Sequence, residues 1–171
     1  FSKKAEEVFL GAIKGLIDTG VKAIIYDVRD NQGGLFESAV NILNTLLPKG
    51  TIVSIIDKSG NENVFMSDAD NMDLQCIVLV NENTVSAAEI FAGVIQSKKY
   101  GIIIGKTTYG KGVAQKYKEL SDGSIVRITY AEYYLPDGSR IHNNGIIPDI
   151  EVDNKKDKDV QLEEAIRYFS E

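Results

Sequence analysis

The sequence predicts a mixed α/β fold. Two short runs, residues 21–28 (VKAIIYDV) and 76–80 (CIVLV), are continuously apolar and rich in β-branched residues, which is typical of buried strands. Each run is followed by a segment with apolar residues at helical spacing, 35–47 and 86–98. Residues 112–134 instead predict two strands joined by a turn. Alternating strands and helices indicate an α/β layered core, and the later strands add an antiparallel hairpin portion.

The other elements of the N-terminal half follow from the same patterns. Residues 3–19 predict an amphipathic helix ended by Gly20, with apolar residues at near-helical spacing: Val8, Ile13, Leu16 and Ile17. Pro48 ends the helix 35–47. Residues 51–57 and 62–66 predict a pair of strands around the turn Ser59-Gly60.

In the C-terminal half, GIIIG at 101–105 predicts another buried strand, and residues 150–152 a short one. Ser121-Asp122-Gly123 is the turn inside 112–134. Residues 153–159 (DNKKDKD) predict a solvated, charged linker. The last segment predicts a helix with one apolar face: Leu162, Ile166 and Phe169. We therefore expect a core over 1–152, with the linker and a helix packed on that core in 153–171.

Composition excludes several classes of protein. The chain of 171 residues is 43% hydrophobic and 26% charged, the balance of a globular protein. With 19 basic and 25 acidic residues the formal charge is −6, which argues against a general nucleic-acid binder. The single Cys76 excludes an internal disulfide, and no His, Cys or carboxylate spacing indicates a metal site. We predict neither a metal nor another cofactor.

Candidate chemistry lies where strands end and helices begin, the edge at which open α/β sheets bind ligands. The first such loop is RDNQGG at 29–34, whose paired glycines allow a sharp turn and close approach of the backbone. Their N–H groups, at the start of a helix, would point toward an anion. Taken alone, the glycine pair also fits an ordinary strand-to-helix turn.

The second loop brings Ser86 to the start of a helix. One interpretation is structural: Ser86 caps the helix and Glu89, three residues on, completes a capping box. The other is chemical: Ser86 is a nucleophile on a strand-to-helix turn, where the Ala87 N–H could donate to an oxyanion. The sequence leaves both interpretations open.

The third loop, GKTTYGKGVAQ, carries Lys111 between two glycines, with Gln115 on the same side of the strand that follows. A Ser–Lys dyad would use Lys111 as the base. Its amine must be neutral to accept the serine proton, and burial is the usual way in which proteins disfavour the charged form. A Ser–His arrangement would instead have to use His142, the one histidine of the chain.

Four separated motifs, in order, resemble those of the carboxy-terminal processing peptidases, or tail-specific proteases, a family of Ser–Lys peptidases. They are DVRDNQGG, NENTVSAAEIFAGVIQ, GKTTYGKGVAQ and YYLPDGSRIHNNGIIPDIEV, which together cover about residues 20–152. Two departures remove no catalytic side chain: Gln32 replaces a common proline, and the residues around the serine differ from the commoner Ala-Ser pattern. The resemblance implies a crotonase-like spiral of ββα units.

The resemblance also implies roles for individual residues. Ser86 would be the nucleophile, Lys111 the general base, and Gln115 the residue that orients the lysine. The backbone N–H groups of Gly34 and Ala87 would form the oxyanion hole, with Gly33 as an alternative donor.

Members of this family cleave near the C-terminus of unfolded or tagged proteins, so the expected activity is that of a serine endopeptidase. The expected partner is a protein or peptide with a free C-terminus, and the expected location of the parent protein is extracytoplasmic. Members carry a PDZ domain before this core; nothing in the sequence resembles one, so we expect a core separated from its PDZ domain. The sequence leaves open whether the protein forms a homodimer.

Two other functions compete with this expectation. The same core could be a non-catalytic module that binds an extended peptide by strand addition. It could also be a crotonase-fold enzyme acting on acyl thioesters, although no basic cluster for the phosphates of a nucleotide is evident.

Overall fold

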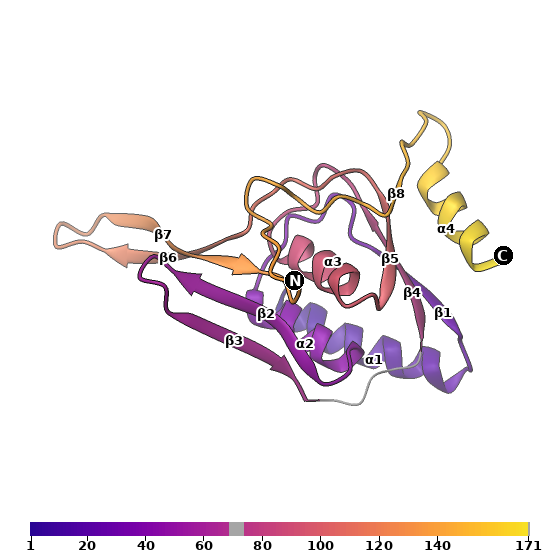
Figure 1. Ribbon diagram of the computed structural model, residues 1–171, viewed down its shortest axis with the longest axis horizontal. Coiled ribbons are helices and arrows are strands. Elements are labelled where there is room, and N and C mark those ends of the chain that lie inside the picture. The colour runs from indigo at the N-terminus through magenta and orange to yellow at the C-terminus, as the bar shows by residue number, and fades with distance from the viewer. Residues whose placement is uncertain (69–73, 171) are drawn as a thin grey trace.

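The computed structural model describes residues 1–68 and 74–170, and within these residues it has two four-stranded sheets (Figure 1). The first sheet is parallel throughout, with the strand order β1-β4-β5-β8. Its strands are β1 (Ala23–Asp27), β4 (Gln75–Val80), β5 (Gly101–Gly105) and β8 (Ile150–Glu151). The observed mixed α/β architecture is the one that the strand–helix alternation predicts.

Helices cover both faces of the parallel sheet, because successive side chains of a strand point to opposite faces. Cys76, Val78 and Val80 of β4 face a large core that also contains α2 (Phe36–Leu46) and α3 (Ala87–Ser97). The alternate residues Ile77 and Leu79 face a smaller core with Ala165 of α4 (Val160–Ser170). This double burial explains why the strands are continuously apolar.

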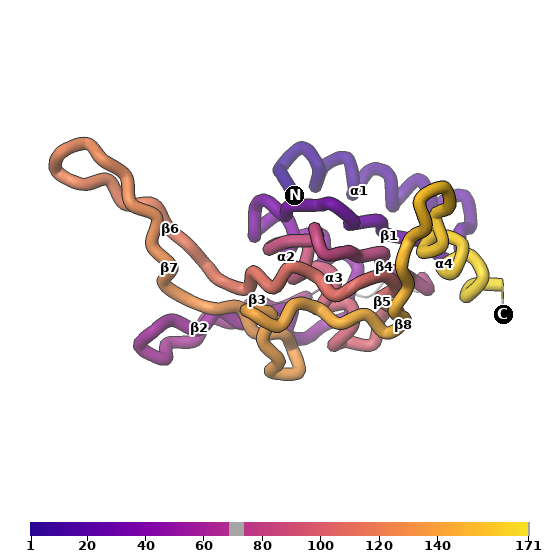
Figure 2. Tube along the Cα trace, turned by 90° about the horizontal axis from the view of Figure 1, so that it is seen from above, coloured from indigo at the N-terminus to yellow at the C-terminus, as the bar shows by residue number. Residues whose placement is uncertain are grey.

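The second sheet is antiparallel, with the strand order β3-β2-β7-β6. Its strands are β2 (Gly50–Asp57), β3 (Glu62–Ser67), β6 (Val113–Glu119) and β7 (Ile125–Tyr134). Figure 2 shows the β6–β7 hairpin reaching far beyond the body of the molecule. Both predicted strand pairs therefore form, and they join in one sheet.

The first helix forms as predicted, but most of the apolar residues that define its predicted apolar face are exposed. In α1 (Lys3–Asp18) Ile13 is buried, whereas the exposed fractions of Val8, Leu16 and Ile17 are 62%, 39% and 38%. Helical spacing identifies an apolar face, but it does not identify what covers that face. A similar difference holds in α4, where Ile166 is 54% exposed and Ala165 is buried instead.

Residues 153–158 are exposed, as the prediction of a solvated linker has it, but polar contacts join this segment to the rest of the chain. Asp159 forms two hydrogen bonds with Arg29, and the side-chain oxygen of Asn154 accepts the backbone N–H of Gln161. Asp153 pairs with Lys106 at 2.6 Å. A charged composition indicates contact with water, but here complementary charges lie opposite some of these residues.

No helix among the described residues is both long and apolar enough to cross a lipid bilayer.

Cys76 is expected to resist alkylation while the protein is folded. Its side chain is 4% exposed, and burial raises the pKa of the thiol to about 12. Because the thiolate is the reactive form, we expect iodoacetamide at pH 8 to modify native protein at least about 100-fold more slowly than urea-unfolded protein. Mass spectrometry of timed samples measures both rates, and equal rates would contradict the burial of Cys76.

Candidate active site

The backbone at Ser86 has a strained geometry of the kind found at functional turns. Its φ of 59° and ψ of −118° lie in a region that non-glycine residues rarely adopt. An ordinary N-cap residue is extended, so the capping interpretation of Ser86 does not account for this conformation. The turn places Ser86 at the start of α3, beyond the carboxyl end of β4.

Of the three predicted oxyanion donors, the structure leaves two free. The Gly33 N–H donates to the side-chain oxygen of Asn31 at 2.9 Å and is therefore occupied in this structure. Within the described part of the chain, no hydrogen bond occupies the N–H of Gly34 or of Ala87.

Gly33 instead allows two loops to approach closely. Its φ is +87°, and a Cβ atom there would lie 2.6 Å from the Val85 carbonyl oxygen and 2.8 Å from the Ala87 nitrogen. Any other residue at this position would push the first loop away from the turn that carries Ser86.

Hydrogen bonds join the first loop to the second. The Val85 N–H donates to the Asn31 carbonyl at 2.9 Å, and the Thr84 hydroxyl donates to the Val28 carbonyl at 2.8 Å. Asp30, whose φ is 56°, accepts bonds from two asparagine side chains of the second loop, those of Asn81 and Asn83. These contacts fix the glycine pair relative to Ser86.

The buried carboxylate of Glu89 joins the second loop to the third. One oxygen accepts the N–H groups of Ser86 at 2.8 Å and Lys111 at 2.9 Å. The other accepts the N–H of Gly110 and the hydroxyl of Thr108, both at 2.6 Å. The Glu89 side chain is 0% exposed. The predicted bond to the Ser86 N–H is present, but Glu89 also fixes the loop that carries Lys111.

Ser86, Lys111, Gln115 and Gly34 line one cleft of about 510 Å³. No hydrogen bond joins Ser86 Oγ to Lys111 Nζ, and the Gln115 amide donates to the Thr129 hydroxyl at 3.0 Å instead of orienting the lysine. A β-bulge between Ala114 and Gln115 makes Thr129 the cross-strand partner of Gln115. Four of the six predicted site residues therefore meet in one cleft, whereas Gly33 and Ala87 are not among the residues that line it. The contact predicted for Gln115 is not formed in this structure.

Aromatic side chains form a wall of the same cleft. The ring of Phe36 stacks on Tyr133 at 5.1 Å and meets Phe65 edge-on at 4.9 Å. Burial raises the pKa of Tyr133 to about 12, so this wall stays uncharged at neutral pH. The charged side chains along the cleft are Glu37, Lys111 and Arg127. An apolar side chain of a ligand could therefore lie close to Ser86.

A larger cavity of about 660 Å³ lies at the amino ends of β4 and β5, away from these loops. It is lined by Cys76, Tyr100 and Phe169 among others, and by neither Ser86 nor Lys111. We take the smaller cleft as the site because the predicted catalytic side chains meet there. His142 is not among the residues that line it, which disfavours the Ser–His arrangement.

Across residues 1–68 and 74–170, no three metal-ligating side chains come together.

Comparison with known proteins identifies the family. The sequence profile of peptidase family S41 matches residues 1–152. The chain belongs to peptidase family S41. The chloroplastic C-terminal processing peptidase of Tetradesmus obliquus is 39% identical over 144 residues, which are 83% of this chain and 31% of that relative. The carboxyl-terminal-processing protease of Synechocystis sp. is 37% identical over 87% of this chain and 35% of its own length.

A solved structure agrees with the sequence comparisons. The photosystem II D1 C-terminal processing protease matches 90% of this S41 chain and 40% of its own chain, with a TM-score of 0.85 and 37% identity. The resemblance to the carboxy-terminal processing peptidases, predicted from four motifs, is therefore confirmed, as is the mixed α/β class. The chain spans about a third of the length of these two curated relatives.

The local sequence patterns do not predict two groups of contacts. Glu89 carries a local signal, its spacing of three from Ser86, but that signal predicts only a helix cap. Asp159 and Arg29 are 130 positions apart and pair only through the fold. No local pattern connects them.

Proposed function

We propose that this S41 chain is the catalytic core of a serine endopeptidase that works through a Ser86–Lys111 dyad. The observation that supports this most directly is the shared cleft of Ser86, Lys111 and Gly34, with Ser86 in a strained turn at a helix N-terminus. We also infer that the core is a crotonase-like spiral of ββα units.

The proposed reaction is acyl transfer in two halves. Neutral Lys111 takes the proton of Ser86 Oγ as that oxygen attacks the peptide carbonyl, and the carbonyl oxygen becomes an oxyanion. The N–H groups of Gly34 and Ala87 stabilise this charge, each such donor being worth about 10²–10³ in rate. Lys111 then gives its proton to the leaving amine, and water attacks the acyl-enzyme to release the acid.

Gln115 has a proposed role once substrate is bound. In the free protein its NH₂ group donates to the hydroxyl of Thr129, the residue opposite it on the neighbouring strand β7. A rotation of this side chain would turn its carbonyl oxygen toward Lys111, from which it would accept a hydrogen bond. Catalytic contacts are often loose in the absence of substrate and tighten in the complex.

The proposed substrates are unfolded or tagged proteins, cut near a free C-terminus. The aromatic wall formed by Phe36, Phe65 and Tyr133 favours an apolar substrate side chain near the cleaved bond. The extracytoplasmic location and a PDZ domain as partner are likewise proposals, which rest on the family resemblance.

Casein cleavage tests this function. We expect the chain to hydrolyse fluorescein-labelled casein and its Ser86→Ala variant to lose this activity while still binding the same casein in fluorescence anisotropy. If the wild type binds casein but does not cut it, the non-catalytic peptide-binding module is the better description. No hydrogen bond joins Ser86 Oγ to Lys111 Nζ, two described residues of the cleft, and this observation keeps the alternative in the test.

A further inference from the structure

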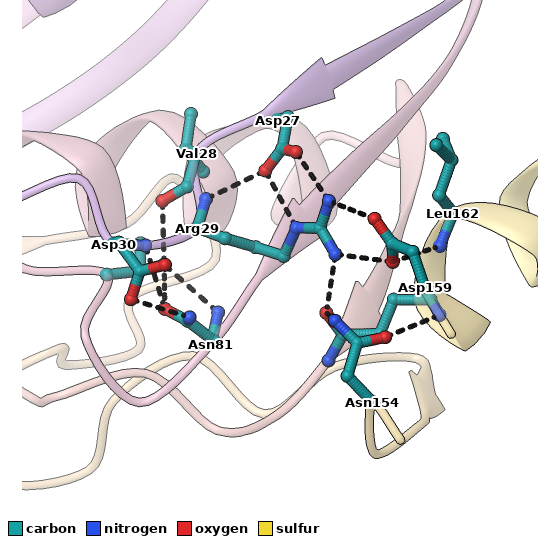
Figure 3. Close-up of polar contacts among 10 residues, drawn as sticks. Asp27, Val28, Arg29, Asp30, Asn81, Asn154, Asp159 and Leu162 are labelled. Atoms are coloured by element: carbon teal, nitrogen blue, oxygen red, sulfur yellow. Dashed lines mark hydrogen bonds and ion pairs between the residues drawn. The ribbon is translucent and has the colours of Figure 1, made fainter. Parts of the chain in front are cut away.

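The guanidinium of Arg29 lies between two carboxylates, and all five of its N–H groups are used (Figure 3). Two donate to Asp27 at 2.9 and 2.6 Å, and two donate to Asp159 at 2.7 and 2.8 Å. The fifth donates to the side-chain oxygen of Gln161 at 3.2 Å. Two bidentate contacts of this kind fix a guanidinium in both position and orientation.

Hydrogen bonds within the segment that leads into α4 hold Asp159 in place. One of its oxygens accepts the N–H of Leu162 at 3.1 Å, the pattern of a residue that caps the start of a helix, here α4. Next to it Gln161 is 2% exposed, and its amide nitrogen donates to the Val152 carbonyl at 2.8 Å. The segment that leads into α4 is thus folded around Gln161 and presents the Asp159 carboxylate to Arg29.

Arg29 begins the loop that carries the oxyanion donor. Its backbone follows β1, and Gly34 lies five residues further along the chain. Three residues of this loop have positive φ: Asp30, Gly33 and Gly34, with angles of 56°, 87° and 140°. At Asp30, which is not a glycine, a positive φ persists only where tertiary contacts hold it. The asparagines of the second loop hold one side, and the N-terminal amine of Phe1 donates to the Gly33 carbonyl at 2.8 Å. The start of the loop is held by two sets of contacts: the hydrogen bonds of Val28 to Leu79 and Thr84, and the side chain of Arg29.

Opposite charges strengthen the contact between Asp159 and Arg29. Arg29 lowers the pKa of Asp159 to about 2, so the carboxylate is ionised throughout the neutral range. Without Asp159, two guanidinium N–H groups lose their acceptors, and Arg29 is held only by Asp27 and Gln161. A shift of the guanidinium toward these remaining partners would move the start of the loop.

We propose that Asp159 is a positioning residue for the reaction: through Arg29 it holds the 29–34 loop in the register in which Gly34 lines the same cleft as Ser86. This inference rests on the proposed function, since it assigns the Gly34 N–H to the oxyanion. It also gives a role in the site to a residue beyond the stretch matched by the S41 profile.

Kinetics with Asp159→Asn test the proposal. A displacement of about 1 Å can cost roughly 10²-fold in rate, so we expect kcat for labelled casein to fall between about 10- and 100-fold, with KM within about twofold. Asp159→Glu, which restores the charge, should recover part of the loss. The matched control is Glu163→Gln, which removes a carboxylate of the same segment from its 2.6 Å pair with Lys158 and should change neither constant.

A ¹H–¹⁵N correlation spectrum reports the environment of the loop's backbone N–H groups directly, and this measurement does not depend on catalysis. The Gly33 and Gly34 cross-peaks should move in Asp159→Asn and stay in place in Glu163→Gln. Unmoved glycine peaks, or moved peaks with an unchanged kcat in a cleaving wild type, would overturn the proposal. If the wild type does not cleave casein, the proposed function fails by itself, and the glycine peaks alone decide whether Asp159 sets the loop.

Discussion

Replacing Lys111 by Met should lower kcat for casein by about 10⁴-fold or more, the size of loss seen when the base of a serine hydrolase is removed. Methionine keeps the length and the apolar stem of the side chain but cannot accept the serine proton. Lys111 is only partly buried, so the variant should fold with a similar Tm. Initial rates over a range of casein concentrations, with thermal unfolding of both proteins, measure the two quantities.

Two control variants make this result specific. Lys106→Met removes another amine from the same loop, one that pairs with Asp153 at 2.6 Å, and should leave kcat unchanged. His142→Gln removes the only other side chain that the sequence offered as a base, and it should also be neutral. A large loss in His142→Gln together with near-normal activity in Lys111→Met would contradict the Ser–Lys assignment.

The parts of the fold that could be predicted are those whose signal is local. Strand β4 is continuously apolar because helices bury both of its faces, and the turn Ser121-Asp122-Gly123 lies between β6 and β7 as predicted. The exposed apolar face of α1 and the pairing of Asp159 could not be predicted, because they depend on what lies opposite in space. Helical spacing and charge give no information about such a partner.

The candidate site also has features that the sequence predicts and features that it does not. Motif order and strand ends predict that Ser86, Lys111 and the glycine pair belong to neighbouring loops, and the structure brings Ser86, Lys111 and Gly34 to one cleft. The bond of the Gly33 N–H to Asn31 and that of Gln115 to Thr129 depend on loop geometry and on a bulge. A one-residue irregularity in a strand changes which side chain faces which, and the alternation of residues cannot anticipate it.

Glu89→Ala should destabilise the protein by about 3–5 kcal/mol and lower its Tm by about 10 °C. The substitution removes the acceptor of three backbone N–H groups and one hydroxyl in a place that water does not reach. Each unsatisfied buried donor costs about 1–3 kcal/mol, partly recovered where the Thr108 hydroxyl rotates. Urea unfolding followed by circular dichroism measures the change. Glu82→Gln, at an exposed position of the preceding loop, is the control and should stay within about 0.5 kcal/mol of the wild type.

Glu89→Gln separates the effect on the site from the effect on stability. The amide keeps the shape of the side chain and one acceptor oxygen, but its NH₂ group must face N–H groups that now lack an acceptor. The N–H groups of Ser86 and Lys111 share a single carboxylate oxygen, so both loops should move together. We therefore expect the casein activity of the folded Gln variant to fall by at least about 10-fold, at temperatures where circular dichroism shows it fully folded. Full activity in that variant would mean that Glu89 stabilises the fold without setting the distance between nucleophile and base.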